Sequence, residues 1–141
     1  MSRDRRSSRI LAMQALCQWE VQGDESSPAL AEFLAGQEAS PGAIVYATTL
    51  VHALWSQRDE IDKRIASASI KWDLARISSV ERNVMRVAIV ERLGGEVPSR
   101  VILDEAIEIG REYGSGESPR FINGVLDAVF QSIQKELGKN T

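Results

Sequence analysis

The chain has 141 residues, 43% of them hydrophobic and 26% charged, a balance typical of globular domains with a real core. Its length fits one ordinary domain and excludes two independent enzymatic domains. The single cysteine, Cys17, excludes an intramolecular disulfide, and with one histidine, His52, the chain lacks the Cys and His set of a structural zinc site.

Charge is unevenly distributed along the chain. The net charge is -3, so a positive coat that binds nucleic acid without specificity is excluded. Four arginines against Asp4 nevertheless give the first nine residues a net charge of +3, which leaves -6 for the remainder. The positive field is therefore local and terminal.

The sequence shows the pattern of neither a signal peptide nor a membrane-spanning segment. The start lacks the uninterrupted apolar region of a signal peptide, and no later run is long enough to cross a bilayer. We therefore expect a cytoplasmic protein without a membrane contact.

Apolar residues recur at helical spacing along the chain, and no comparable run alternates with period two. An all-α fold is predicted, with short connections between the helices. The predicted helices span residues 7–22, 28–35, 41–66 with a break near Arg58-Asp59, 79–93, 98–113 and 119–137.

Serine, proline and glycine mark the predicted helix ends. Serine precedes proline at Ser27, Ser40 and Ser118, a pattern that places serine at the N-cap and proline in the first turn. Ser78 and Glu81 have the spacing of a capping box. Glycines that follow the periodic segments are predicted to end helices in a left-handed conformation: Gly23, Gly36, Gly94-Gly95, Gly114 and Gly138.

The arginines at the start have three interpretations. They could form a solubilising tail, pair with acidic residues where the first helix begins, or clamp phosphates. Arg5 and Arg9 are one helical turn apart, so a helix that included them would hold a positive ridge on a rigid element.

No arrangement typical of an enzyme stands out. His52 has no acidic neighbour one turn away, which favours packing over catalysis. The glycine-rich segment 114–118 precedes a helix but lacks the ending of a P-loop, so a flexible connector or a contact with a polynucleotide backbone is favoured. Asp59, Glu60 and Asp62 suggest the solvated start of a helix rather than a metal site. We expect no catalytic residue, metal or cofactor.

The final helix begins with an unusual mixture of side chains. Arg120, Phe121 and Asn123 supply a cation, a stacking face and an amide within one turn, which suits unpaired RNA bases. Phe121 also heads an apolar stripe, so ordinary core is its alternative and the favoured interpretation from periodicity alone. Gly124 within a helix suggests a close approach to the backbone. The tryptophans are expected in the core: Trp19, Trp55 and Trp72.

Several separated motifs together resemble one family, the bacterial transcription antitermination factor NusB. They are the arginine-rich start running into Ala12–Glu20 (AMQALCQWE), Glu60-Ile61-Asp62 before Trp72, Val80–Ala88 (VERNVMRVA), Asp104–Glu108 (DEAIE) after Val97-Pro98, and Phe121–Asp127 (FINGVLD). Their order and spacing cover nearly the whole chain.

The resemblance implies a compact bundle of about six or seven helices in two small helical subdomains, near residues 1–75 and 76–141. It implies no catalysis, binding to the boxA element of nascent ribosomal RNA, and partnership with the small-subunit ribosomal protein NusE in the antitermination complex of RNA polymerase. The implied RNA surface comprises Arg3, Arg5, Arg6, Arg9, Glu117, Ser118, Arg120, Phe121 and Asn123. The implied NusE surface centres on Glu81 and its helix. We expect the arginines of the start to share one positive patch with Arg120.

Two positions depart from the family pattern, since Cys17 stands where tyrosine is common and Ala128 where lysine is common. Other functions stay open at this point. A NusB-like domain could act in ribosomal RNA maturation or with an RNA methyltransferase, or the chain could be a pure protein-interaction adaptor. An apolar helix face serves a homodimer as well as a core, so the sequence leaves the oligomeric state open.

Overall fold

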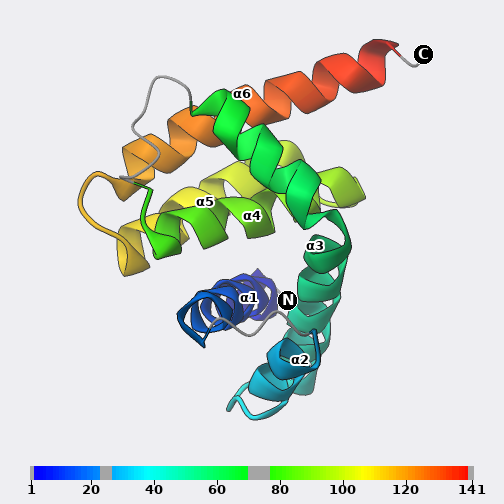
Figure 1. Ribbon diagram of the computed structural model, residues 1–141, viewed down its shortest axis with the longest axis vertical. Helices are drawn as coiled ribbons and strands as arrows, with labels where there is room; N and C mark the ends of the chain where they lie inside the picture. Colours follow the sequence, from blue (N-terminus) through cyan, green and yellow to red (C-terminus); the bar gives the residue numbers. More distant parts are fainter. Residues whose placement is uncertain (1, 23–26, 70–76, 140–141) are drawn as a thin grey trace.

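A computed structural model describes residues 2–22, 27–69 and 77–139, which form six helices and no strand (Figure 1). The helices are α1 (Ser2–Gln22), α2 (Ser27–Ala35), α3 (Pro41–Ala68), α4 (Ser79–Gly94), α5 (Ser99–Tyr113) and α6 (Ser118–Lys139). The all-α prediction is confirmed. Among the described segments, no helix combines the length and apolar character needed to span a bilayer.

Helix α4 is the centre of the molecule. It contacts α1, α3, α5 and α6, and every residue from Asn83 to Glu91 is buried. A helix buried on all sides needs partners for its polar groups, and α4 has four buried polar side chains: Glu81, Asn83, Arg86 and Glu91. Figure 1 shows α1 and α6 on either side of the α4 and α5 pair.

The buried apolar side chains form one cluster to which all six helices contribute. Trp19 and Trp55 pack against this cluster as half-buried residues, and their rings meet edge to face with their centroids 5.2 Å apart. Trp72 lies outside the described residues. The division into subdomains near residues 1–75 and 76–141 stays a prediction.

Two predicted helix starts have the expected caps. The Ser40 hydroxyl accepts from the Ala43 amide, with Pro41 in the first turn. At α4, the Ser78 hydroxyl accepts from the Glu81 amide and the Glu81 carboxylate accepts from the Ser78 amide, both at 3.1 Å, which is the predicted capping box. The cap expected at Ser27 falls on a side chain outside the described residues.

The predicted start of α1 at residue 7 is wrong, because the helix already begins at Ser2. Long-range contacts hold its first turns. The Ser8 hydroxyl donates at 2.8 Å to the carbonyl of Ala43 in α3, and Arg6 pairs with Glu105 in α5. Such tertiary contacts offset the fraying that a terminal turn would otherwise show.

The predicted break near Arg58-Asp59 is also wrong, since α3 is one helix of 28 residues. The Arg58 guanidinium lies over the Trp55 ring and donates to the Trp55 carbonyl within the same helix. Buried Ile61 and Ile65 continue the apolar stripe past the charged residues. Asp59, Glu60 and Asp62 therefore lie inside a helix and do not start one.

Left-handed helix ends are rarer than predicted. Among the described glycines, Gly95 alone has a positive φ, 76°, and it ends α4 as expected. Gly114 ends α5 in an extended conformation, Gly36 follows α2 with a negative φ, and Gly138 lies within α6. Gly23 lies outside the described residues.

Candidate nucleic-acid interface

Arg9 is buried rather than exposed, with 5% of its surface accessible. Its guanidinium donates to both carboxylate oxygens of Glu91, at 2.8 and 2.9 Å, and to Glu105 at 3.4 Å. Burial works against the charged form, but the hydrogen bonds and charge of Glu91 outweigh it and raise the pKa of Arg9. The Arg9 guanidinium is therefore enclosed in an internal ion pair and is not exposed as a phosphate clamp would be, so its implied RNA contact stays a prediction.

Arg6 lies at the edge of the same cluster. Its Nε donates to Glu105 at 2.9 Å, while half of its side chain stays exposed. The hydrogen bond and charge of Glu105 raise the pKa of Arg6. An exposed pair of this kind contributes little stability, so a phosphate can compete for the guanidinium.

Arg5 is exposed and lies over an aromatic ring of α3. Its Cζ is 3.6 Å from the centroid of the Tyr46 ring. The Tyr46 hydroxyl in turn donates to Glu91 at 2.6 Å. Burial, followed by the hydrogen bond to Glu91, raises the pKa of Tyr46 to about 12, so the hydroxyl stays a donor at neutral pH. Arg5, Arg6 and Arg9 thus belong to one network with Tyr46 and two carboxylates.

Arg3 belongs to α1, but its side chain lies outside the described part of the structure.

The start of α6 is tied to the start of α4. The buried Ser118 hydroxyl donates to Glu81 Oε2 at 2.8 Å and accepts from the Ser115 amide at 2.9 Å. Helix α6 already includes Ser118, so this residue does not precede the helix as predicted. Glu81 is buried as well, and its two oxygens accept from Ser118 and from its own capping box. Both side chains are thus occupied within the protein, and the RNA contact implied for Ser118 and the NusE contact implied for Glu81 stay predictions.

Beside this link, the first turns of α6 present one apolar face and one polar face. Phe121 is 8% exposed and packs in the core, so the favoured core interpretation agrees with its position and an open stacking face is not offered. Arg120 and Asn123 are exposed, as is Glu117 just before them. Within the described residues nothing would touch a Cβ at Gly124, so no part of this chain makes the close approach predicted there.

The two groups do not form one positive patch. Arg9 is bound to Glu91 near the end of α4, whereas Ser118, two residues before Arg120, is bound to Glu81 in the first turn of α4. These points are about 15 Å apart along the helix axis. Helices α1 and α6 also lie on opposite sides of the α4 and α5 pair (Figure 1). The structure therefore offers two separate exposed groups, Arg5 with Arg6, and Arg120 with Asn123.

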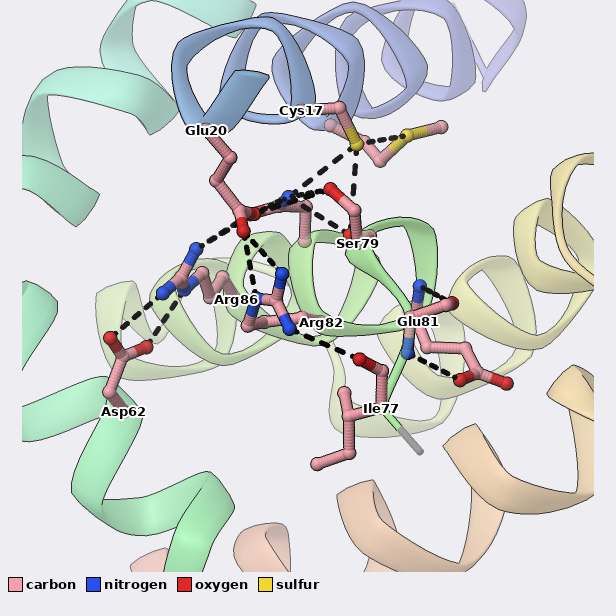
Figure 2. A network of polar contacts seen from close by, with 11 residues as sticks. Cys17, Glu20, Asp62, Ile77, Ser79, Glu81, Arg82 and Arg86 are labelled. Atoms are coloured by element: carbon pink, nitrogen blue, oxygen red, sulfur yellow. Dashed lines mark hydrogen bonds and ion pairs between the residues drawn. The ribbon is translucent and has the colours of Figure 1, made fainter. Parts of the chain in front are cut away.

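A second polar cluster joins the other end of α1 to α3 and α4 (Figure 2). Arg82 donates to Glu20 at 3.0 Å, and Arg86 donates to both oxygens of Asp62 at 2.8 and 2.9 Å. Asn83 also donates to Glu20. Burial alone would raise the pKa of Glu20, but the hydrogen bonds from Arg82 and Asn83 lower it. This cluster fixes the scaffold rather than a ligand.

The remaining sequence candidates have ordinary surroundings. His52 is exposed on α3, which differs from the packing role that the sequence favoured. The described residues contain no group of His, Cys, Asp and Glu that could hold a metal ion. The acidic partners Glu91 and Glu105 and the aromatic Tyr46 were missed by sequence reasoning, because they are more than 40 positions from the arginines they contact.

The model of the NusB family matches residues 6–131 of the chain. The chain belongs to the NusB family. Relatives named transcription antitermination protein NusB include one from Syntrophus aciditrophicus, 38% identical over 135 residues, covering 95% of this chain and 84% of that protein. Another, from Desulfosudis oleivorans, is 40% identical over 138 residues, covering 95% and 87%. The family is one of transcription antitermination proteins and not of enzymes.

Solved NusB structures have the same fold. NusB from T. maritima is 34% identical and aligns with a TM-score of 0.79 over 90% of each chain. A structure of NusB and NusE in complex with double-stranded RNA contains a chain 24% identical, with a TM-score of 0.80, covering 94% of this chain and 99% of that one. The all-α NusB fold inferred from the motifs is confirmed.

The two departures from the NusB pattern have different surroundings. Cys17 is half-buried against α4, where its Sγ lies 3.5 Å from the Asn83 amide nitrogen and 3.7 Å from the Ser79 carbonyl oxygen. Ala128 is exposed on α6, so a lysine there would reach solvent. Of the two, only the exchange at Ala128 removes a charge from the surface.

Proposed function

We propose that this protein is a transcription antitermination factor that binds boxA RNA of nascent ribosomal RNA transcripts together with NusE. In this role it joins transcribing RNA polymerase in the cytoplasm and keeps transcription of ribosomal RNA processive. Membership of the NusB family supports the proposal.

The observation that carries the RNA-binding part is the rigid support of exposed cations on an otherwise anionic chain. Arg5 and Arg6 are held on α1 by contacts with Tyr46 and Glu105, and these partners are fixed through Glu91 and Arg9. The entropy of ordering the two guanidiniums is thereby partly lost before RNA arrives. Their phosphate contacts would position the strand, while base contacts would specify it.

In this proposal the residues of the implied RNA surface have two roles, contact with RNA and internal support. Arg5, Arg6, Arg120 and Asn123 contact RNA from two places, with Arg3 and Glu117 beside them. Arg9, Ser118 and Phe121 act from within by holding α1 and α6 in place. Unpaired RNA suits this arrangement, because a single strand can bend around the α4 and α5 pair and offer its bases.

The NusE surface is assigned to the neighbourhood of Glu81 on α4 and the start of α6. Glu81 itself contributes by fixing both helix starts, since its carboxylate is occupied by Ser118 and Ser78. We propose that NusE recognises the relative positions of the α4 and α6 starts and not the charge of Glu81.

Electrophoretic mobility of labelled boxA RNA tests the proposal. The protein is mixed with the RNA alone, with NusE alone and with both, and a scrambled RNA of equal length is the control. We expect the RNA to bind more tightly when NusE is present, because joint binding of RNA and NusE in one complex requires a favourable coupling free energy between them, and this coupling is reciprocal. An affinity that NusE leaves unchanged, or that the scrambled RNA equals, contradicts the proposal.

A further inference from the structure

The contact between Arg5 and Tyr46 is a flat stack with an exposed outer side. A distance of 3.6 Å between Cζ and the ring centroid is close to the van der Waals separation of two carbon atoms. A tilted guanidinium would drive its nitrogens into the ring at that distance, so the two planes lie face to face. Arg5 is exposed, so the face of its guanidinium that points away from the ring is open to solvent.

The ring beneath Arg5 is itself held in position. Tyr46 is half-buried, and its hydroxyl donates at 2.6 Å to Glu91, which also accepts both hydrogen bonds from Arg9. The ring therefore cannot turn away without breaking a bond to a buried carboxylate. Arg5 rests on a fixed support, unlike an arginine on a free surface.

We propose that the outer face of Arg5 is a stacking site for one unpaired nucleobase of the bound RNA, with Tyr46 as its positioning residue. The inference rests on the proposed RNA binding. Bases stack on guanidinium planes as well as on aromatic rings, and the positive charge also favours the neighbouring phosphate. This site supplies the planar face that the buried Phe121 cannot offer.

A second arginine and aromatic pair, which also involves α3, lacks these features. Arg58 lies 4.4 Å from the Trp55 centroid, donates to the Trp55 carbonyl, and is followed by exposed Asp59 and Glu60. The adjacent carboxylates repel an RNA backbone. Near Arg5, by contrast, Arg6 adds a cation, and the acidic neighbour Asp4 accepts a hydrogen bond from Ser40 at 3.3 Å. Arg58 is therefore a matched control.

The test is a double-mutant cycle between Arg5→Lys and single abasic sites in boxA RNA, measured by fluorescence anisotropy with NusE present. Lysine keeps the charge and loses the plane, while an abasic nucleotide keeps the phosphate and loses the base. We expect Arg5→Lys to lower the affinity for intact RNA about tenfold. At one position the abasic RNA should show no further loss with Arg5→Lys, because both changes remove the same contact.

Arg58→Lys should leave the affinity for every RNA unchanged. Tyr46→Phe keeps the ring but loses the hydroxyl that holds it to Glu91, so the coupling at that position should weaken without disappearing. Tyr46→Leu should abolish the coupling in a variant shown to be folded by its circular dichroism. If the losses from Arg5→Lys and from an abasic site multiply at every position, the stacking site is overturned. If the wild-type protein binds no boxA RNA even with NusE, the proposed function fails instead.

Discussion

Arg9 and Glu91 lie 82 positions apart in the chain and meet through two hydrogen bonds of 2.8 and 2.9 Å. Both side chains are buried, so the pair links α1 to α4 inside the protein. Arg9 is therefore buried, although its position in a basic segment predicts an exposed side chain. The exposed charges that remain on α1 depend on this pair for their support.

The first prediction concerns that pair. Arg9→Ala should lower the free energy of unfolding by about 3–5 kcal/mol, because it leaves the Glu91 carboxylate buried without its counter-ion. Urea denaturation followed by circular dichroism measures the change. Arg100→Ala is the control, since the Arg100 side chain is 86% exposed, and it should cost less than about 0.5 kcal/mol. Equal losses in the two variants would show that Arg9 is not a buried structural group.

The second prediction concerns salt. If Arg5, Arg6 and Arg120 each neutralise one phosphate, log K for boxA RNA should fall with log salt at a slope of about -2. Arg120→Ala should reduce the magnitude of the slope by about 0.7, and Arg100→Ala should leave it unchanged. Filter binding at several salt concentrations provides the measurement. A flat response in the wild-type protein would refute the phosphate contacts.

The third prediction follows from the separation of the two exposed groups. Arg5 and Arg120 lie on helices that flank the α4 and α5 pair, so they should contact different nucleotides. The free-energy losses of Arg5→Ala and Arg120→Ala in RNA binding should therefore add within about 0.5 kcal/mol in the double variant. A double variant no weaker than either single variant would mean that both arginines serve one contact.

The fourth prediction distinguishes the two interpretations of Phe121. Phe121 and Phe130 are buried to similar extents on α6, at 8% and 7% exposure. Each change to alanine should lower the free energy of unfolding by about 3–5 kcal/mol. RNA affinity, corrected for the folded fraction, should then be similar in the two variants. A selective loss of affinity in Phe121→Ala at equal stability would restore Phe121 as a base-contacting residue.

The fifth prediction concerns acid stability. The folded protein holds the pKa of Glu20 below the ordinary value of 4.5, so the folded state binds fewer protons there than the unfolded state. The stabilisation is complete above about pH 4.5 and is lost as the pH falls through the folded pKa. Unfolding in urea between about pH 3 and pH 6 should show a shallower pH dependence in Glu20→Gln. An unchanged dependence would mean that other carboxylates dominate.

Local patterns predicted the elements of this fold well. The Ser78 and Glu81 capping box and the Ser40 cap rest on interactions within one turn, which a sequence displays directly. Helix α1 extends beyond its prediction because α3 and α5 hold its first turns, and no local pattern reports those contacts.

The candidate site was harder to predict for the same reason. The positive charge of the start is visible in the sequence, but its division into buried Arg9, paired Arg6 and stacked Arg5 is decided by residues on three other helices. Ser118 and Glu81 similarly read as separate surface residues until the packing of α6 against α4 brings them together.

The carboxylate of Glu91 has a consequence beyond stability. It anchors Arg9 and Tyr46 at once, and Tyr46 carries Arg5 on its ring. A substitution of Glu91 would therefore change the affinity for the transcript, although Glu91 itself does not contact the RNA. Differences in affinity among related proteins can then originate at a position that the ligand never approaches.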